Sequence, residues 1–399
     1  MKKLALVSLL LLAPAAVYLA AKTRAAEPDP QKPAGQPSKE EFETWAKELE
    51  ARGIEVSAGL WDLQNGRLLQ GWKEGQLLIP ASTTKAVTTY AMLRTWKPDY
   101  TIDTEILGDL QGDTVKGDLV VKGAGDPFFT NEQVWETAET LKKLGVKRIT
   151  GGIRADQSAY DGQRYGSGWE DTTADVLPPI APMSVNFNRD DKGRLVGDPT
   201  KLAEEVFERI LVQDGIAVEH KPGAGAAPAR IAVHTSPPIR MLVQDINKFS
   251  NNFMVEMLVK RFGNGSWNGG VRRVMDFYKT NFGLGPESMK LTDASGLSKE
   301  NRLSAKTLAI VLRSAWNDFE VGPEYISSLK VQGGEPFRLK HKDANLARRL
   351  RVKSGYLSNA RSLTGYLQMP DGKLRVFAVI LNGDSKDEDL WAQITRWAN

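Results

Sequence analysis

Strand patterns stand near both ends of the chain. Glu55–Trp61 and Arg67–Trp72 flank Asn65-Gly66, a dipeptide that favours a tight hairpin turn. The pattern returns near the other end, over Leu350–Lys353, Ser362–Gln368 and Leu374–Leu381. A hairpin from one end and strands from the other can complete one antiparallel sheet, with the helical segments between them packed beside it. The chain therefore predicts an α+β fold.

The segment between these ends has a different character. Strand patterns at Thr101–Leu107 and Asp118–Lys122 are followed by helical patterns, a loop-rich stretch and a proline-bounded linker that ends at Pro228. With 399 residues, of which 41% are hydrophobic, the chain can form two cores. We expect residues 102–227 to form a smaller inserted α/β domain, and residues 41–101 and 228–399 to form the main domain.

The N-terminus has the pattern of an export signal. Lys2 and Lys3 precede the apolar run Leu4–Ala21, which is long for a signal peptide and near the minimum for a membrane span. Residues 1–26 are therefore a signal peptide or an uncleaved anchor. Residues 27–40 contain four prolines among polar residues and predict a tether. Either reading places most of the chain in the periplasm or another extracytoplasmic space. An uncleaved anchor would in addition attach the chain to the membrane through its N-terminus.

The composition excludes several classes of chemistry. The formal charge of +4 is mild and spread along the chain, so it does not suggest nucleic acid as a partner. The absence of cysteine excludes disulfides and thiolate catalysis. Only His220, His234 and His341 are present, without metal-ligand spacing, and no Gly-x-Ser-x-Gly elbow accompanies them. We expect no metal and no cofactor.

The stretch Pro80-Ala81-Ser82-Thr83-Thr84-Lys85 opens an apolar helical run. Positions i and i+3 share a helix face, so the hydroxyl of Ser82 and the amine of Lys85 can meet. A neutral lysine can accept a serine proton and so activate a nucleophile. The motif alone is weak, because a second Ser-x-x-Lys stands at Ser327–Lys330 and a helix cap beside a solvated lysine is the common structural explanation.

Two further motifs follow in order. Ser250-Asn251-Asn252 is a break between helical patterns, and Lys353-Ser354-Gly355 stands on a predicted strand. Together with Ser82-x-x-Lys85 they match the set known from penicillin-binding proteins and class A β-lactamases. In such a site Ser250 can pass a proton towards a leaving amine. Asn252 can hold Lys85 by its carbonyl end and a substrate amide by its NH₂ end.

The third motif predicts a surface for an anionic substrate. Lys353 would lower the pKa of Lys85 and attract a carboxylate, which the hydroxyl of Ser354 could also bind. On a strand, Arg349, Arg351 and Lys353 would share one face and strengthen this attraction. Gly355 lets a substrate backbone approach closely. The backbone N–H groups of Ser82 and Tyr356 would form an oxyanion hole.

With these motifs the chain resembles the D-alanyl-D-alanine carboxypeptidase/endopeptidases, the class C low-molecular-mass penicillin-binding proteins of the peptidase S13 family. The resemblance covers nearly everything after the tether, and includes Gly117–Pro127, Gly168-Trp169-Glu170-Asp171 and Asp293-Ala294-Ser295-Gly296-Leu297-Ser298. It implies a five-stranded antiparallel sheet flanked by helices, with an insertion between the first two motifs. It also implies removal of terminal D-alanine, cleavage of peptidoglycan crosslinks and acylation of the nucleophilic serine by β-lactams.

Three features depart from the family's pattern. Tyr356 replaces the usual threonine after the third motif, and its side chain is expected to narrow the cleft. Gly333–Phe337 replaces a Gly-x-Asp-Gly-Thr-Leu stretch, and the insertion is short for the family. By resemblance, Asp171 matches an aspartate of the inserted domain that binds the amine of a diamino acid.

Three hypotheses follow. The first is an exported serine DD-peptidase that cleaves peptidoglycan stem peptides through an acyl-enzyme. The second is a catalytically weak or inactive peptidoglycan-binding protein on the same fold, which the altered third motif favours. The third is a β-lactamase or esterase, against which the large insertion argues, because small substrates need no such wall.

Overall fold

The computed structural model describes residues 38–169, 177–221, 228–331 and 343–399. The predicted signal or anchor and nearly all of the tether therefore lie outside the described residues. A search of the described part of the chain finds no helix with the length and apolar character needed to cross a membrane.

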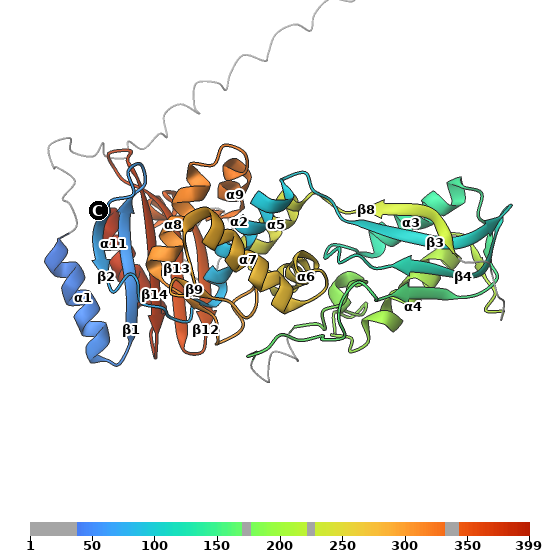
Figure 1. Cartoon of the computed structure of the whole chain (residues 1–399), viewed down its shortest axis with the longest axis horizontal. Coiled ribbons are helices and arrows are strands. Elements are labelled where there is room, and N and C mark those ends of the chain that lie inside the picture. The colour runs from blue at the N-terminus through green and yellow to red at the C-terminus, as the bar shows by residue number, and fades with distance from the viewer. Residues whose placement is uncertain (1–37, 170–176, 222–227, 332–342) are drawn as a thin grey trace, which may run out of the picture. The chain divides into compact units, whose positions relative to one another are not determined.

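The main sheet joins the two ends of the chain, as the strand patterns predict. Its strands are antiparallel and follow the order β11-β12-β13-β14-β1-β2, so the N-terminal hairpin pairs with the last strand (Figure 1). The five expected strands are present, and the two-residue β11 adds a sixth at the edge among the described residues. The bounds are β1 Glu55–Asp62, β2 Leu68–Trp72, β11 Lys330–Val331, β12 Leu350–Leu357, β13 Ala360–Gln368 and β14 Leu374–Asn382.

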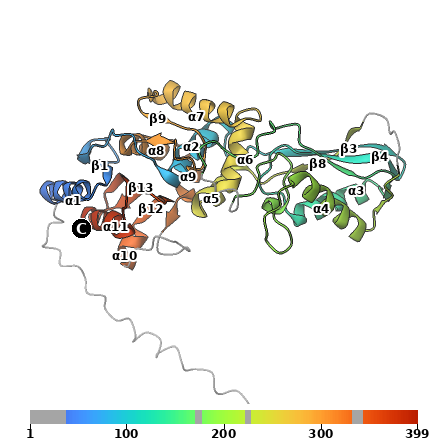
Figure 2. The ribbon, with the colours of Figure 1, turned by 90° about the horizontal axis from the view of Figure 1, so that it is seen from below.

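Helices cover both faces of this sheet (Figures 1 and 2). On one face α1 (Lys39–Ala51) and α11 (Asp387–Ala398) pack with a core that includes the fully buried Trp397. On the other face lies the larger core, in which α2 (Thr84–Trp96) is buried from Thr84 to Leu93. The remaining helices of the main part are α5 Ile239–Lys248, α6 Asn252–Phe262, α7 Trp267–Phe282, α8 Ala305–Trp316, α9 Gly322–Ser328 and α10 Ala344–Arg348.

The middle of the chain forms a second sheet with its own core. Its strand order is β7-β5-β4-β3-β8, and β6 also pairs with β4. Helices α3 (Asn131–Lys143) and α4 (Pro199–Gln213) pack against it in one hydrophobic cluster (Figure 2). The bounds are β3 Asp103–Gln111, β4 Thr114–Lys122, β5 Arg148–Ile149, β6 Ile153–Asp156, β7 Ala217–Val218 and β8 Ala229–Thr235; a separate pair is β9 Met289–Lys290 with β10 Arg302–Leu303.

The second sheet extends past the predicted boundary at residue 227. β8 pairs with β3 through six register partners, from Thr235 opposite Asp103 to Ala229 opposite Gly108, so the return strand belongs to the inserted sheet. The prediction missed it because the boundary was set at the proline-bounded linker that ends at Pro228, whereas the strand after this linker returns to the inserted sheet. Contacts join both sheets into one compact unit, Pro37–Asn399, and the division into two domains stays a prediction.

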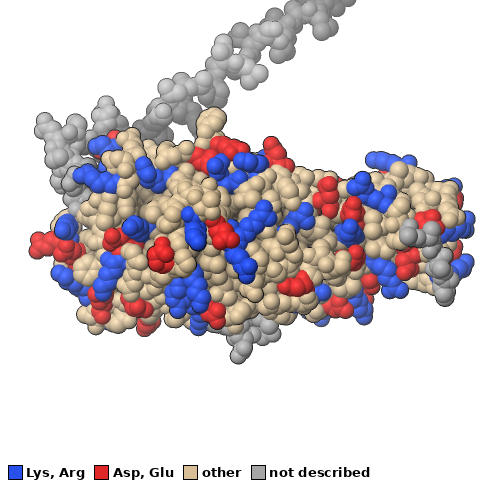
Figure 3. Space-filling model, in the orientation of Figure 1, with Lys and Arg blue, Asp and Glu red and all other residues tan. Residues whose placement is uncertain are grey.

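Positive and negative side chains are interspersed over the face shown in Figure 3, without a broad field of one sign. This distribution agrees with the mild formal charge of +4.

Candidate active site

Ser82 lies in a strained turn before α2. Residues Ala81–Thr83 form a short 3-10 helix, and Ala81 has a φ of +48°, in the left-handed region that L-residues rarely adopt. The carbonyl of Pro80 accepts hydrogen bonds from Ser362 Oγ at 2.5 Å and Thr83 Oγ1 at 2.7 Å. These bonds tie the turn to β13. The prediction that Pro80 and Ser82 open the helix is right to within one turn, because α2 itself begins at Thr84.

Lys85 points from the first turn of α2 to the Ser82 hydroxyl. Its Nζ is 2.9 Å from Ser82 Oγ, 2.6 Å from Asn252 Oδ1 and 2.7 Å from the carbonyl oxygen of Ser295. The amide and carbonyl oxygens can only accept, whereas the hydroxyl can donate. A neutral amine has two N–H groups and one lone pair, so this set of partners suits an uncharged Lys85 that receives the hydroxyl proton.

The second motif is the turn that starts α6. Ser250 has a φ of +54°, and the side chain of Asn251 caps the helix by accepting a hydrogen bond from the N–H of Met254 at 3.0 Å. Asn252 is the first residue of α6, and its side-chain oxygen is the one that meets Lys85. Strain at Ser250 and a cap at Asn251 therefore fix the turn from which Asn252 reaches Lys85 of α2.

Lys353 brings the third motif to the same place. This buried side chain comes from β12, and its Nζ lies 3.0 Å from Ser250 Oγ and 2.8 Å from the carbonyl oxygen of Ser354. The structure thus links Ser82, Lys85 and Asn252 in one set of contacts, and Ser250 with Lys353 in another that shares the Ser250–Asn252 turn.

Burial determines the charge state of both lysines. It lowers the pKa of Lys85 to about 7, against opposing contributions from Glu256 and Asp293. Burial also holds the pKa of Lys353 well below its usual value, and repulsion from Lys85 lowers it further. Of the two causes that the sequence offers for a neutral Lys85, burial and a nearby cation, burial is the one that acts on its pKa here, and Lys353 is not among the causes.

Gly355 allows β12 to lie against the turn that contains Pro80 and Ser82. A β-carbon at this position would be 2.7 Å from the backbone nitrogen of Ser82 and 2.8 Å from the Pro80 carbonyl oxygen. The bare backbone is therefore required for the close approach of strand and turn. The neighbouring Ser354 is half-buried on β12.

Tyr356 directs its ring to Arg361. The Arg361 guanidinium lies 4.1 Å from the ring centroid, and Arg361 in turn pairs with Asp387 at the start of α11. Side chains alternate along a strand, so Tyr356 has the parity of Val352, which packs in the core beneath α1 and α11. Lys353 and Gly355 have the opposite parity. This packing therefore does not favour the expected narrowing of the cleft by the side chain of Tyr356.

Two predicted parts of the site are not described, and one predicted residue lies away from it. Asp171 and the Gly333–Phe337 loop lie outside the described residues. Arg349 precedes β12, at the end of α10, and donates to the carbonyl oxygens of Gln368 and Ala398, so the expected face shared by Arg349, Arg351 and Lys353 does not form.

The chemistry of the residue types alone also did not predict the groups that pack beneath Lys85, namely the Asp293–Ser298 loop and Glu256. The Asp293–Ser298 loop supplies the carbonyl that accepts from Lys85, and Ala294 accepts a hydrogen bond from Thr88 of α2 at 3.0 Å. The buried Glu256 of α6 accepts hydrogen bonds from the backbone of this loop. The resemblance pointed to the loop, but a single glutamate inside an apolar helix carried no motif.

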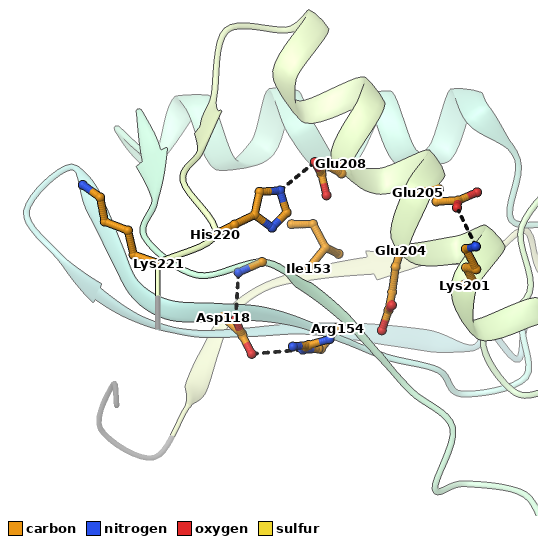
Figure 4. A pocket seen from close by; sticks show the side chains of 10 residues that line it. Asp118, Ile153, Arg154, Lys201, Glu204, Glu205, Glu208, His220 and Lys221 are labelled. Atoms are coloured by element: carbon orange, nitrogen blue, oxygen red, sulfur yellow. Dashed lines mark hydrogen bonds and ion pairs between the residues drawn. The ribbon is translucent and has the colours of Figure 1, made fainter. Parts of the chain in front are cut away.

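A separate pocket of about 520 Å³ lies in the inserted sheet region, beside α4 (Figure 4). Its polar side chains pair with one another: His220 with Glu208, Lys201 with Glu205, and Asp118 with Arg154. Within the described ranges, no group of three or more His, Asp or Glu side chains could hold a metal ion.

The fold and these contacts define a Ser-x-x-Lys serine hydrolase of the penicillin-binding type. The model of the D-Ala-D-Ala carboxypeptidase 3 (S13) family matches residues 43–195 and 189–399, so the chain belongs to this family of serine-type D-Ala-D-Ala carboxypeptidases. It is 26% identical to a D-alanyl-D-alanine carboxypeptidase of Actinomadura sp. (strain R39), over 83% of this chain and 78% of that protein. It is 27% identical to a carboxypeptidase of Mycobacterium tuberculosis, over 76% of this chain and 71% of that protein.

Solved structures share the fold. Penicillin binding protein 4 from Haemophilus influenzae superposes with a TM-score of 0.74 at 19% identity, over 89% of this chain and 99% of that one. A predatory peptidoglycan endopeptidase from Bdellovibrio bacteriovorus superposes with a TM-score of 0.56 at 14% identity, over 86% and 91%. At these identities the likeness concerns the fold, and the predicted penicillin-binding/β-lactamase-like α+β architecture is confirmed.

Proposed function

We propose that this chain is an exported serine DD-carboxypeptidase and DD-endopeptidase that cleaves D-alanyl bonds of peptidoglycan stem peptides through an acyl-enzyme. The observation that carries the proposal is the contact between Lys85 Nζ and Ser82 Oγ, 2.9 Å long, made by a lysine whose pKa burial lowers to about 7, so that much of it is neutral near neutral pH. Family membership supplies the reaction class.

In the acylation step, Ser82 Oγ bonds to the carbonyl carbon of the penultimate D-alanine while Lys85 Nζ takes the hydroxyl proton. When the C–N bond breaks, the leaving amine receives a proton through Ser250, so the proton removed from Ser82 ends on the released product. Lys353 supports Ser250 through its 3.0 Å contact. Water then hydrolyses the ester and restores Ser82.

Substrate binding uses the third motif. A terminal carboxylate beside Lys353 favours its ammonium form and so restores the charge that burial suppresses in the free enzyme. By family resemblance, the Ser354 hydroxyl is proposed to bind the same carboxylate, although Ser354 alternates with Lys353 along β12. The backbone N–H groups of Ser82 and Tyr356 are proposed to hold the oxyanion. The NH₂ group of Asn252 remains for a substrate amide. Asp171 is proposed, by family resemblance, to bind the amine of a diamino acid.

The endopeptidase activity and the binding of β-lactams are each supported by one comparison. The predatory protein with the shared fold is described as a peptidoglycan endopeptidase, and a β-lactam complex of the Haemophilus influenzae protein superposes with a TM-score of 0.67. Export is supported by the pattern of residues 1–26, and the sequence leaves membrane association through this segment as the alternative to cleavage.

The test is product analysis on defined muropeptides. The mature protein should release D-alanine from pentapeptide monomers and convert crosslinked dimers to monomers, and Ser82→Ala should do neither. Binding of peptidoglycan by both proteins, with no product from the folded wild type, would contradict the proposal and establish the non-catalytic alternative.

A further inference from the structure

Two buried carboxylates lie beneath the proposed catalytic lysine, and each is capped by an indole. Trp267 Nε1 donates to Glu256 Oε2 at 2.7 Å, and Trp169 Nε1 donates to Asp293 Oδ2 at 2.8 Å. Both carboxylates are fully buried. The two indole rings meet edge to face, with centroids 5.8 Å apart. Such groups cost free energy to bury unless each oxygen is satisfied, so their retention here calls for a role.

Hydrogen bonds connect Glu256 to Lys85 through a single residue, Ser295. Its Oε1 accepts from the N–H of Ser295 at 2.6 Å and of Ala294 at 3.2 Å. The carbonyl oxygen of the same Ser295 accepts from Lys85 at 2.7 Å. The carboxylate therefore fixes the peptide that presents an acceptor to the lysine.

The partners of Glu256 suit its ionised form. All those that the structure describes are N–H donors, from Trp267, Ala294 and Ser295, and both carboxylate oxygens accept. Burial, as the larger cause, and the nearby Asp293 raise the pKa of Glu256 to about 8, and the hydrogen bonds from Ser295 and Trp267 oppose this rise by favouring the ionised form. A protonated Glu256 would place an O–H against a donor.

Ionisable side chains of both signs act on Lys85 and Lys353. Lys85 from α2 and Lys353 from β12 are two buried amines, and Lys330 of β11 adds a further positive charge that acts on Lys353. Glu256 and Asp293 supply the negative charges on the other side of Lys85, and both raise the pKa of Lys85.

We propose that Glu256 is a positioning residue for acylation: its carboxylate holds the Ala294–Ser295 backbone so that Ser295 presents its carbonyl to Lys85, and its charge stabilises the ammonium group that Lys85 becomes when it takes the Ser82 proton. Asp293 has a different task. It accepts from the backbone of Gly296 and Ser298, so it closes its own loop and does not touch the peptide that meets Lys85. The inference rests on the proposed function, since it assigns a role within that reaction.

The test is the pH profile of acylation by benzylpenicillin in Glu256→Gln. Removal of the negative charge lowers the pKa of Lys85, so the lysine becomes neutral at lower pH. The acid limb of the profile, where the acylation rate rises with pH, therefore moves to lower pH. A shift of about one pH unit is expected for the loss of one charge several ångströms away in a protein interior. The maximal rate should fall about tenfold, because the NH₂ group of glutamine cannot accept from the N–H donors around it, so the Ser295 carbonyl is held less firmly.

A second variant keeps the test decisive if Glu256→Gln folds poorly. Trp267→Phe removes one N–H donor but keeps the carboxyl group, so it favours protonation of Glu256 and should move the acid limb in the same direction by a smaller amount. Glu300→Gln is the matched control, since it removes an exposed carboxylate from the same stretch of chain and should leave the profile unchanged.

The outcomes separate the two proposals. If the wild type is not acylated, the proposed function fails. If the wild type is acylated and the acid limb of every folded Glu256 and Trp267 variant coincides with that of the wild type, the role of Glu256 is overturned while the function stands.

Discussion

Gly296 and Ala81 are in direct backbone contact. A β-carbon built on Gly296 would lie 1.9 Å from the carbonyl oxygen of Ala81, and Gly296 has a φ of +83°. The loop that supports Lys85 therefore lies flush against the turn that carries Ser82. No side chain fits between them, which gives a physical reason for glycine in the Asp293–Ser298 segment.

Gly296→Ala should consequently damage both stability and acylation. We expect the free energy of unfolding to fall by more than about 2 kcal/mol, from backbone strain and overpacking together, and the acylation rate to fall at least tenfold. Gly53→Ala is the matched control: its φ is +77° but its added β-carbon would meet nothing within 4 Å. It should cost only about 1 kcal/mol. Equal losses in chemical denaturation of the two variants would contradict the described contact.

The rate of acylation should depend on pH through Lys85. Because burial lowers the pKa of Lys85 to about 7, its neutral form dominates above that pH and is lost below it. The second-order rate constant for benzylpenicillin should rise with pH along a limb centred near 7. In Lys85→Arg the guanidinium stays charged, so the rate constant should be at least about a thousandfold lower than that of the wild type at every pH. A flat wild-type profile across this limb would exclude Lys85 as the base.

Asn252→Asp should move the same limb in the opposite direction from Glu256→Gln. The side-chain oxygen of Asn252 lies 2.6 Å from Lys85 Nζ, and a carboxylate there would stabilise the ammonium form. The limb should shift to higher pH by about one unit or more, with weaker acylation at neutral pH. Stopped-flow acylation across the pH range measures this shift, and a limb that stays at the wild-type pH would show that the contact is absent in solution.

Tyr356→Thr should change little. The ring is 45% exposed and stacks on Arg361, so the substitution restores the family's usual residue without touching Lys353 or Gly355. The acylation rate should stay within about threefold of the wild type, as for most surface substitutions. A gain of tenfold or more would show that the tyrosine does obstruct the cleft, as the sequence alone suggested.

The order and local setting of the three motifs predicted which segments meet, because each motif combines specific residue types with a recognisable start of a helix, turn or strand. The main sheet followed from one hairpin signal and three late strand patterns. The mutual proximity of Ser82, Lys85 and Asn252 could be predicted in this way from the sequence alone.

The remaining features depend on tertiary packing that no local pattern encodes. Burial, which sets the pKa of Lys85, is a property of the assembled core. Glu256 is a lone acid in the apolar helix α6, and only the fold shows that three N–H groups meet it. The start of β12 at Leu350, which leaves Arg349 outside the strand, likewise follows from the short helix before it.

The most direct measurement of the central claim is mass spectrometry of the folded protein after incubation with benzylpenicillin, followed by peptide mapping. The account predicts one covalent adduct per chain, on the peptide that contains Ser82, and none in Ser82→Ala. A folded wild-type protein that carries no adduct, or carries it on another residue, would contradict the claim that Ser82, with Lys85 beside it, is the nucleophile.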